Sequence, residues 1–159
     1  MKNKATEKLF NLAYQDLMTN TYNRNAYEER LQKLRRDNVN LNNTSCVVVD
    51  INNLKHINDN FGHHTGDEAI RLVATSLSET IGTKADIFRV GGDEFVCIAD
   101  FDIRGYISEF HDLLGFKAKE KIYPLSVAWG YAIYDSKRFS GIDDLIKYCD
   151  ERMFKNKKK

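Results

Sequence analysis

Two apolar runs joined by a four-residue turn limit the folds open to this chain. Residues 87–90 and 95–99 are rich in β-branched and aromatic side chains, and Gly91-Gly92-Asp93-Glu94 separates them. A connection this short, with two glycines, is typical of a β-hairpin. Because the strands of a hairpin are antiparallel, the chain is not a simple series of parallel βαβ units.

The other expected elements follow from hydrophobic periodicity and capping residues. Apolar residues at spacings of three and four predict helices over residues 5–16, 24–34, 65–81, 104–114 and 142–153. Asn23 is expected to cap the second helix, and Thr65 and Ser140 begin two expected capping boxes. Apolar runs predict further strands over 46–50 and 125–134. This order of elements predicts an α+β fold, a mostly antiparallel central sheet flanked by helices.

Length and composition favour one domain in a reducing compartment. The 159 residues show no break in composition, so we expect a single domain over residues 1–159, with 1–15 as a leading helix or linker. Apolar stretches such as 46–49 are far shorter than the ~20 residues of a membrane-spanning helix, and the amino terminus lacks a secretory signal. We therefore expect a cytoplasmic domain without membrane contact. The three widely spaced cysteines favour buried reduced thiols, and the net charge of +1 indicates no nucleic-acid partner.

Carboxylates stand where predicted strands meet turns. Asp50 ends the first strand, and Asp93 and Glu94 lie in the hairpin turn. If the hairpin strands flank the first strand, these groups meet at one edge of the sheet, where Mg²⁺ would relieve their repulsion. The carbonyl of Ile51 would add an oxygen, and the turn glycines would let a triphosphate approach the main chain. A turn that merely uses glycine and acidic residues is the competing interpretation.

The segment from Asp50 to Asp67 decides between these interpretations. It reads DINNLKHINDNFGHHTGD, and it stands in order with GGDEF at 91–95, DLMT at 16–19 followed by Asn23-Arg24, and CDERMFKNK at 149–157. In these four segments the chain resembles the GGDEF family of diguanylate cyclases. The resemblance covers nearly the whole chain from about residue 14, and four matched segments in one order are not expected by chance.

The resemblance implies both a fold and a reaction. The fold would be similar to the palm of nucleotidyl cyclases and polymerases, with a ferredoxin-like βαββαβ core. The reaction would condense two GTP molecules into cyclic di-GMP and two pyrophosphates with Mg²⁺ or Mn²⁺. Because each domain holds one GTP, catalysis would require a homodimer. An upstream sensor or receiver domain is also implied, which makes the chain an excised piece of a longer sensor protein.

The resemblance also assigns roles to individual residues. The metal ligands would be Asp50, Ile51, Asp93 and Glu94, and the catalytic residues would be Asp93, Glu94 and Lys55. Glu94 would either bind metal or help to activate the attacking hydroxyl. The substrate-binding residues would be Asn58, His63, Asp67, Gly91, Gly92 and Lys157. Among these, Lys157 would neutralise phosphate charge as Lys55 does, Asn58 and Asp67 would read the guanine edge, and His63 would contact the nucleotide or brace the loop.

The chain departs from the family pattern in three places. Asn52 replaces a second aspartate, so we expect a weaker or altered second metal site. Thr83-Lys84-Ala85-Asp86 lacks the arginine of the family's inhibitory product site, so we expect that site to be absent. The chain ends before the usual Gly-Arg-Asn, and its basic run at Lys155 and 157–159 is either a solvated tail or part of a phosphate-binding terminus.

Two other functions compete with the cyclase. The first is a GGDEF module that binds GTP or a partner protein in cyclic di-GMP signalling without efficient catalysis, which Asn52 would favour. The second is a cyclase for another nucleotide pair, which Asp67 disfavours because its carboxylate accepts from the two donors on guanine that adenine lacks. Saturable binding of GTP with magnesium but without turnover would select the first, and a screen of GTP against ATP would settle the second.

Overall fold

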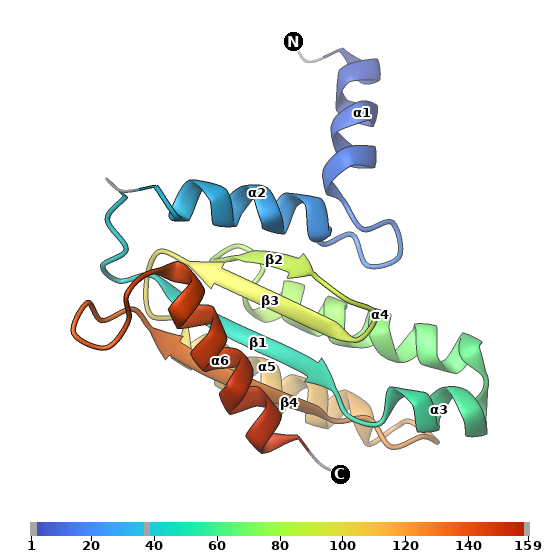
Figure 1. Ribbon diagram of the computed structural model, residues 1–159. Helices are drawn as coiled ribbons and strands as arrows, with labels where there is room; N and C mark the ends of the chain where they lie inside the picture. The colour runs from blue at the N-terminus through green and yellow to red at the C-terminus, as the bar shows by residue number, and fades with distance from the viewer. Residues whose placement is uncertain (1–2, 37–38, 158–159) are drawn as a thin grey trace.

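The computed structural model describes residues 3–36 and 39–157 of the chain (Figure 1). Lys158 and Lys159, the last part of the basic run, lie outside the described residues. The elements are α1 (Lys4–Tyr14), α2 (Arg24–Leu34), β1 (Ser45–Ile51), α3 (Leu54–Phe61), α4 (His63–Thr80), β2 (Asp86–Arg89), β3 (Glu94–Ala99), α5 (Arg104–Ala118), β4 (Val127–Ile133) and α6 (Ile142–Asn156).

The four strands form one antiparallel sheet in the order β2-β3-β1-β4. The hairpin prediction is confirmed, because β2 and β3 are neighbours joined by the glycine turn. From β1 to β4 the elements follow the βαββαβ order, with α3 and α4 as the first crossover and α5 as the second. The predicted α+β fold is therefore confirmed.

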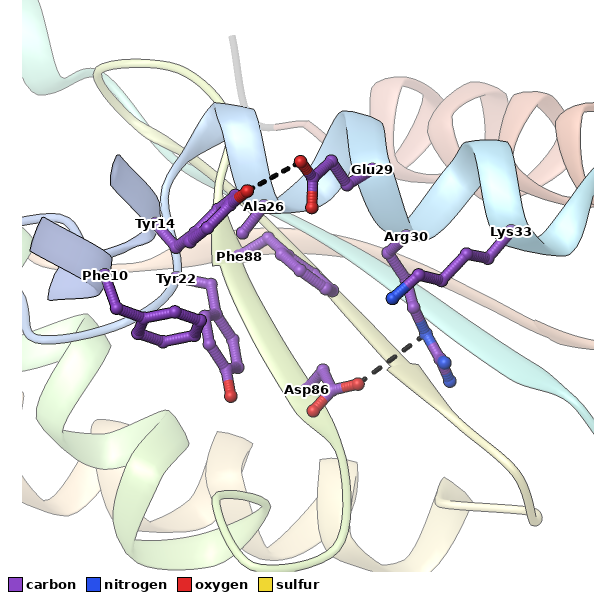
Figure 2. Close-up of a pocket in the computed structure, with 9 residues that line it drawn as sticks. All are labelled: Phe10, Tyr14, Tyr22, Ala26, Glu29, Arg30, Lys33, Asp86 and Phe88. Carbon is purple, nitrogen blue, oxygen red and sulfur yellow. Dashed lines mark hydrogen bonds and ion pairs between the residues drawn. The ribbon is translucent and has the colours of Figure 1, made fainter. Parts of the chain in front are cut away.

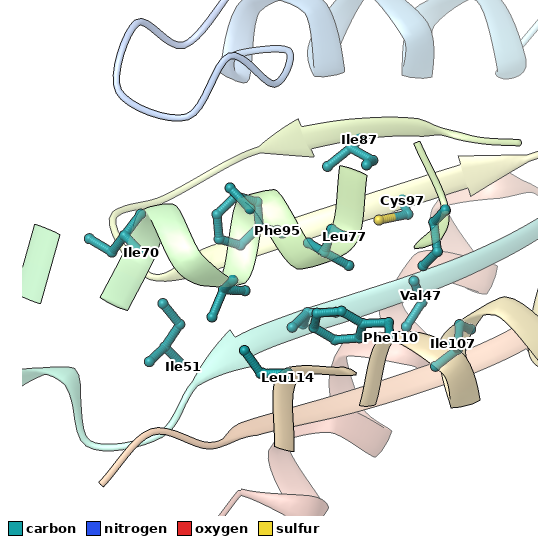
Figure 3. Close-up of a cluster of buried hydrophobic side chains, with 14 of the residues drawn as sticks. Val47, Ile51, Ile70, Leu77, Ile87, Phe95, Cys97, Ile107, Phe110 and Leu114 are labelled. Atoms are coloured by element: carbon teal, nitrogen blue, oxygen red, sulfur yellow. The ribbon is translucent and has the colours of Figure 1, made fainter. Parts of the chain in front are cut away.

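Helices cover both faces of the sheet, so β1 is buried along its whole length. Successive residues of a strand point to opposite faces. Val47 and Val49 accordingly pack with residues of α4 and α5, among them Leu77 and Phe110 (Figure 3). Cys46 and Val48 pack instead with residues of α2 and α6, among them Leu31, Leu145 and Cys149. Two apolar layers explain why β1 reads as a continuous apolar run and not as an alternating one.

The helix α6 crosses β1 and β4 at short range (Figure 1). Gly130 of β4 makes this possible, since a Cβ atom there would lie 2.0 Å from the carbonyl oxygen of Cys149 and 2.5 Å from the amide nitrogen of Met153. The end of α6 is held to the same strand by the side-chain amide of Asn156, which donates to the carbonyl of Trp129 at 3.0 Å. These contacts set where the residue after the helix lies.

The helix α1 lies beside α2 and away from the sheet (Figure 1). None of its residues is buried. A hollow of about 240 Å³ is lined by residues of α1, α2 and β2. At its rim the Tyr14 hydroxyl donates to Glu29 at 2.7 Å (Figure 2). All but one of the residues that line the hollow have aromatic or charged side chains, and none is a predicted site residue: they are Phe10, Tyr14, Tyr22, Ala26, Glu29, Arg30, Lys33, Asp86 and Phe88.

Two predicted capping boxes are wrong. The helix α4 begins at His63, so Thr65 is already inside it and its hydroxyl donates to the carbonyl of Phe61 at 2.8 Å.

At α6 the N-cap is Gly141 without a side-chain cap, although Asp144 accepts from the amide of Ser140 at 3.0 Å. The predicted partner in that box, Asp143, instead forms an ion pair with Arg35. The capping of α2 by Asn23 is confirmed, because Asn23 accepts from the amide of Ala26.

Other differences concern element length and one missed helix. The helix α3 was not predicted, since its eight residues carry one buried side chain, Ile57, and too little periodicity to mark it. The helix α5 extends to Ala118, and β4 is shorter than the predicted strand 125–134. All three cysteines are buried and free, as expected. Among the described residues, no helix is both long and apolar enough to traverse a bilayer.

Candidate active site

The ends of β1 and β3 bring three carboxylates together. Asp50 is the ladder partner of Glu94, and the amide of Ile51 donates to the carbonyl of Asp93 at 3.0 Å. This register follows from the hairpin packing against β1, because β3 then runs antiparallel to β1 and its first residues meet the last residues of β1. The structure thus brings Asp50 to Asp93 and Glu94, which lie more than forty positions later in the sequence, at one edge of the sheet.

Asp50 is buried and only half satisfied. It is 7% exposed, its Oδ2 atom accepts from Nζ of Lys157 at 2.9 Å, and its Oδ1 atom is buried without a hydrogen-bond partner. Burial raises the pKa of the Asp50 carboxyl, the charge of Asp93 raises it further, and the hydrogen bond from Lys157 opposes both. A buried carboxylate oxygen without a donor is costly unless a ligand or cation completes it.

Glu94 is the most perturbed acid of this group. Burial, followed by the charges of Asp150, Asp50 and Asp93, raises its pKa to about 7, and Arg24 offsets part of this effect. Sequence reasoning did not single out Asp150, an exposed residue of α6. The available signal was its place in the segment 149–157 that resembles the family's closing helix.

The donor set fits a cation that substrate oxygens complete. Among the described residues, no group of three or more His, Cys, Asp or Glu side chains is arranged to hold a metal ion. Mg²⁺ rarely needs such a group, because it is usually bound by one or two carboxylates together with waters and phosphate oxygens. Asp50 and Asp93 would supply that smaller set, and the buried Oδ1 atom of Asp50 has no hydrogen-bond partner.

The glycine turn is open to solvent and is held in place by a hydrogen bond from Arg89. Both glycines are exposed, and a Cβ atom at Gly92 would meet nothing within 4 Å. The guanidinium of Arg89 donates to the carbonyl of Gly92 at 2.9 Å and pairs with Asp16 at 3.1 Å. Asp16 also accepts from the amide and hydroxyl of Thr19. The segment 16–19 therefore has a structural role, because Asp16 holds the Arg89 side chain that bonds to the turn.

The predicted guanine-binding residues lie on α3 and α4. Asn58 of α3 packs against Gly66 of α4 so closely that a Cβ atom at Gly66 would lie 1.7 Å from Oδ1 of Asn58. Asp67 follows Gly66 directly and is half-buried. The absence of a side chain at Gly66 therefore leaves the space in which the Asn58 amide packs against α4.

Lys55 and His63 are exposed, on α3 and at the start of α4. Neither side chain makes a hydrogen bond or ion pair with another residue in the part of the chain that the structure describes. Both are therefore available to a ligand, and their predicted roles stay predictions.

Asn52 has a structural contact that the sequence did not reveal. The side chain is 2% exposed, and its amide donates to the hydroxyl of Ser126 at 2.9 Å. The main-chain amide of Asn52 donates to the carbonyl of Ser126, also at 2.9 Å. Asn52 thus joins the end of β1 to the segment that leads into β4.

Comparison with known proteins identifies the family. The family model for the diguanylate cyclase GGDEF domain matches residues 13–159. The chain belongs to the GGDEF family. This GGDEF domain has a TM-score of 0.78 with the crystal structure of the coiled coil and GGDEF domain of DgcB from Caulobacter crescentus in complex with c-di-GMP. The identity is 22%, over 95% of this chain and 84% of that one. At this identity the likeness supports the fold alone.

Two curated relatives are similar in sequence to the GGDEF domain. It is 34% identical over 147 residues to "Probable diguanylate cyclase DgcJ" of Escherichia coli (strain K12), which covers 89% of this chain and 29% of that protein. It is 31% identical over 167 residues to "Signaling protein YkoW" of Bacillus subtilis (strain 168), which covers 98% of this chain and 20% of that protein. The chain spans less than a third of the length of either relative.

Proposed function

We propose that this GGDEF domain is a diguanylate cyclase that condenses two GTP molecules into cyclic di-GMP and two pyrophosphates with Mg²⁺ or Mn²⁺. The observation that carries the proposal is the convergence of Asp50, Asp93 and Glu94 beside an open glycine turn. Membership of the family and similarity to a relative named as a diguanylate cyclase support the same reaction.

Asp50 and Asp93 would hold the cation, with the carbonyl of Ile51 as a further oxygen. When bound, the cation would neutralise charge on the triphosphate and polarise the α-phosphate. The turn at Gly91 and Gly92 would let the phosphates approach the main chain, because no side chain fills the space above Gly92. Lys55 would neutralise the negative charge that builds on the phosphate oxygens in the transition state.

Glu94 would take the proton of the attacking 3′-hydroxyl. A general base works best when its pKa lies near the working pH, and the pKa of Glu94 is raised to about 7. The same reaction requires the hydroxyl of one GTP to meet the α-phosphate of another. Since each domain would hold one GTP, two domains would have to face each other as a homodimer.

Guanine selection would rest on Asn58 and Asp67. The carboxylate of Asp67 accepts from both donors on the guanine edge, and the Asn58 amide both donates and accepts. His63, exposed at the start of the same helix as Asp67, would contact the nucleotide or brace the loop. Adenine lacks the matching donors, so ATP should be a poor substrate.

The test is direct product identification. The domain at high concentration is incubated with GTP and Mg²⁺, and products are identified by mass, with Asp93→Ala as the matched variant and ATP in parallel. We expect cyclic di-GMP from the wild type and none from Asp93→Ala. Equal results for the two proteins would contradict the proposal, and saturable GTP binding without product would select a nucleotide-binding module.

A further inference from the structure

The ion pair between Lys157 and Asp50 places a side-chain cation where the proposed metal would bind. Nζ of Lys157 lies 2.9 Å from Oδ2 of Asp50. The carboxylate side chain of this pair is 10% exposed and the lysine side chain 32%. Among the described residues, this is the one ion pair that Asp50 makes. The lysine therefore acts as the counter-ion of the buried acid in the absence of ligand.

Contacts at the end of α6 fix the position of Lys157. Lys157 is the C-cap residue of α6, and its amide donates to the carbonyl of Phe154 at 3.2 Å. One residue earlier, Asn156 is bonded to Trp129 of β4. The packing of α6 on β4 thus delivers the ammonium group to the end of β1.

We infer that Lys157 competes with the metal ion for Asp50 and is released from this carboxylate when nucleotide phosphates arrive. The inference rests on the proposed function, because it supposes that Asp50 is a metal ligand. A cation on Asp50 and the ammonium of Lys157 would repel each other at such short range. A triphosphate offers Lys157 a second anionic partner, so binding of nucleotide removes the competitor of the metal.

Two consequences follow from this competition. Metal alone binds weakly, because it must displace an ion pair that is already formed. Binding of either metal or nucleotide raises the affinity of the domain for the other, because each favours the arrangement in which Lys157 has left Asp50. This cooperativity adds to the direct affinity of the metal for the nucleotide. The domain would thereby keep free metal out of its site until a triphosphate is present.

The experiment is a titration of the nucleotide-free chain with Mn²⁺, followed by electron paramagnetic resonance of the free ion. Lys157→Met keeps most of the aliphatic stem and removes the charge. We expect it to bind Mn²⁺ more tightly than the wild type, on the order of five- to tenfold, as expected for loss of a partly exposed ion pair. Lys157→Arg retains the charge and should stay close to the wild type.

Lys155→Met is the matched control. Lys155 lies in the last turn of the same helix, is exposed, and forms no ion pair with another described residue. Its substitution makes the same change in net charge without touching Asp50, so it should leave Mn²⁺ affinity nearly unchanged. A role of Lys157 confined to binding phosphate predicts no gain in metal affinity from Lys157→Met.

The outcomes separate this inference from the proposed function. Unchanged or weaker Mn²⁺ binding by Lys157→Met, or the same gain in Lys155→Met, would overturn the competition even if the wild type produces cyclic di-GMP. Tighter binding confined to Lys157→Met would support it even if the wild type produces none. Absence of Mn²⁺ binding to both wild type and Lys157→Met would overturn the inference, because no metal would be present to compete.

Discussion

Asp50 and Glu94 face each other on one rung of the β1–β3 ladder, so two acids from distant parts of the chain share a single environment. Burial and the surrounding charges give Glu94 a pKa of about 7, well above its usual value of 4.5. The metal-free site is therefore under electrostatic strain near neutral pH, and this strain has measurable consequences.

Glu94→Gln should stabilise the metal-free domain at pH 8 but not at pH 5. A raised pKa means that protonation favours the folded state, so stability is fully present below about 4.5 and is lost as pH rises through about 7. Glutamine removes the charge that is unfavourable at pH 8. Urea unfolding at both pH values with a metal chelator measures the effect, and Glu109→Gln on the exposed side of α5 is the control. An equal change at both pH values would contradict the assignment.

Gly66→Ala should weaken guanine-nucleotide binding without unfolding the domain. The added methyl group meets the end of the flexible Asn58 side chain at 1.7 Å, so the amide must rotate away. Alanine is also favoured over glycine inside a helix by about 1 kcal/mol, so α4 itself should not suffer. Calorimetric titration with a non-hydrolysable GTP analogue should show a loss on the order of tenfold, comparable to Asn58→Ala and worth about 1.4 kcal/mol. An unchanged affinity would remove Asn58 from the proposed guanine site.

Asn52→Asp should destabilise the metal-free domain by about 1–3 kcal/mol, because the buried amide donor to Ser126 is lost. The substitution also adds a carboxylate two residues after the buried Asp50. Restoring the family's usual aspartate would thus carry a structural cost here. Thermal unfolding with and without Mg²⁺ measures it, and recovery of stability in Mg²⁺ would show that the new carboxylate reaches the cation. Stability equal to the wild type in chelator would mean that the bond to Ser126 contributes little.

Gly130→Ala should cost about 3 kcal/mol of folding free energy, because the new Cβ atom collides with the main chain of α6 and the helix must move. The matched variant is Gly115→Ala on α5, where a Cβ atom meets nothing within 4 Å and helix propensity predicts a gain of about 1 kcal/mol. Denaturant titration compares the two. Similar stabilities would show that α6 adjusts without penalty.

Local patterns in the chain were enough for the fold class and for part of the site. Short turns, β-branched runs and helical periodicity are short-range properties, and they predicted the hairpin, the sheet class and every helix except α3. The sequence predicted the meeting of Asp50 with Asp93 and Glu94 only on the condition that the hairpin flanks β1. The structure meets this condition because β3 pairs antiparallel with β1, which places the turn at the end of β1.

Contacts between distant segments required the tertiary structure. Lys157 lies 107 positions from Asp50, and its ion pair depends on the close approach of α6 to Gly130. The bond from Asn52 to Ser126 and the position of Asp150 near Glu94 depend likewise on how β4 and α6 pack. A motif shows which residue types are present. The hydrogen-bond or ion-pair partner of each buried polar group is set instead by how the helices pack on the sheet, because a shift of one helix would exchange one partner for another.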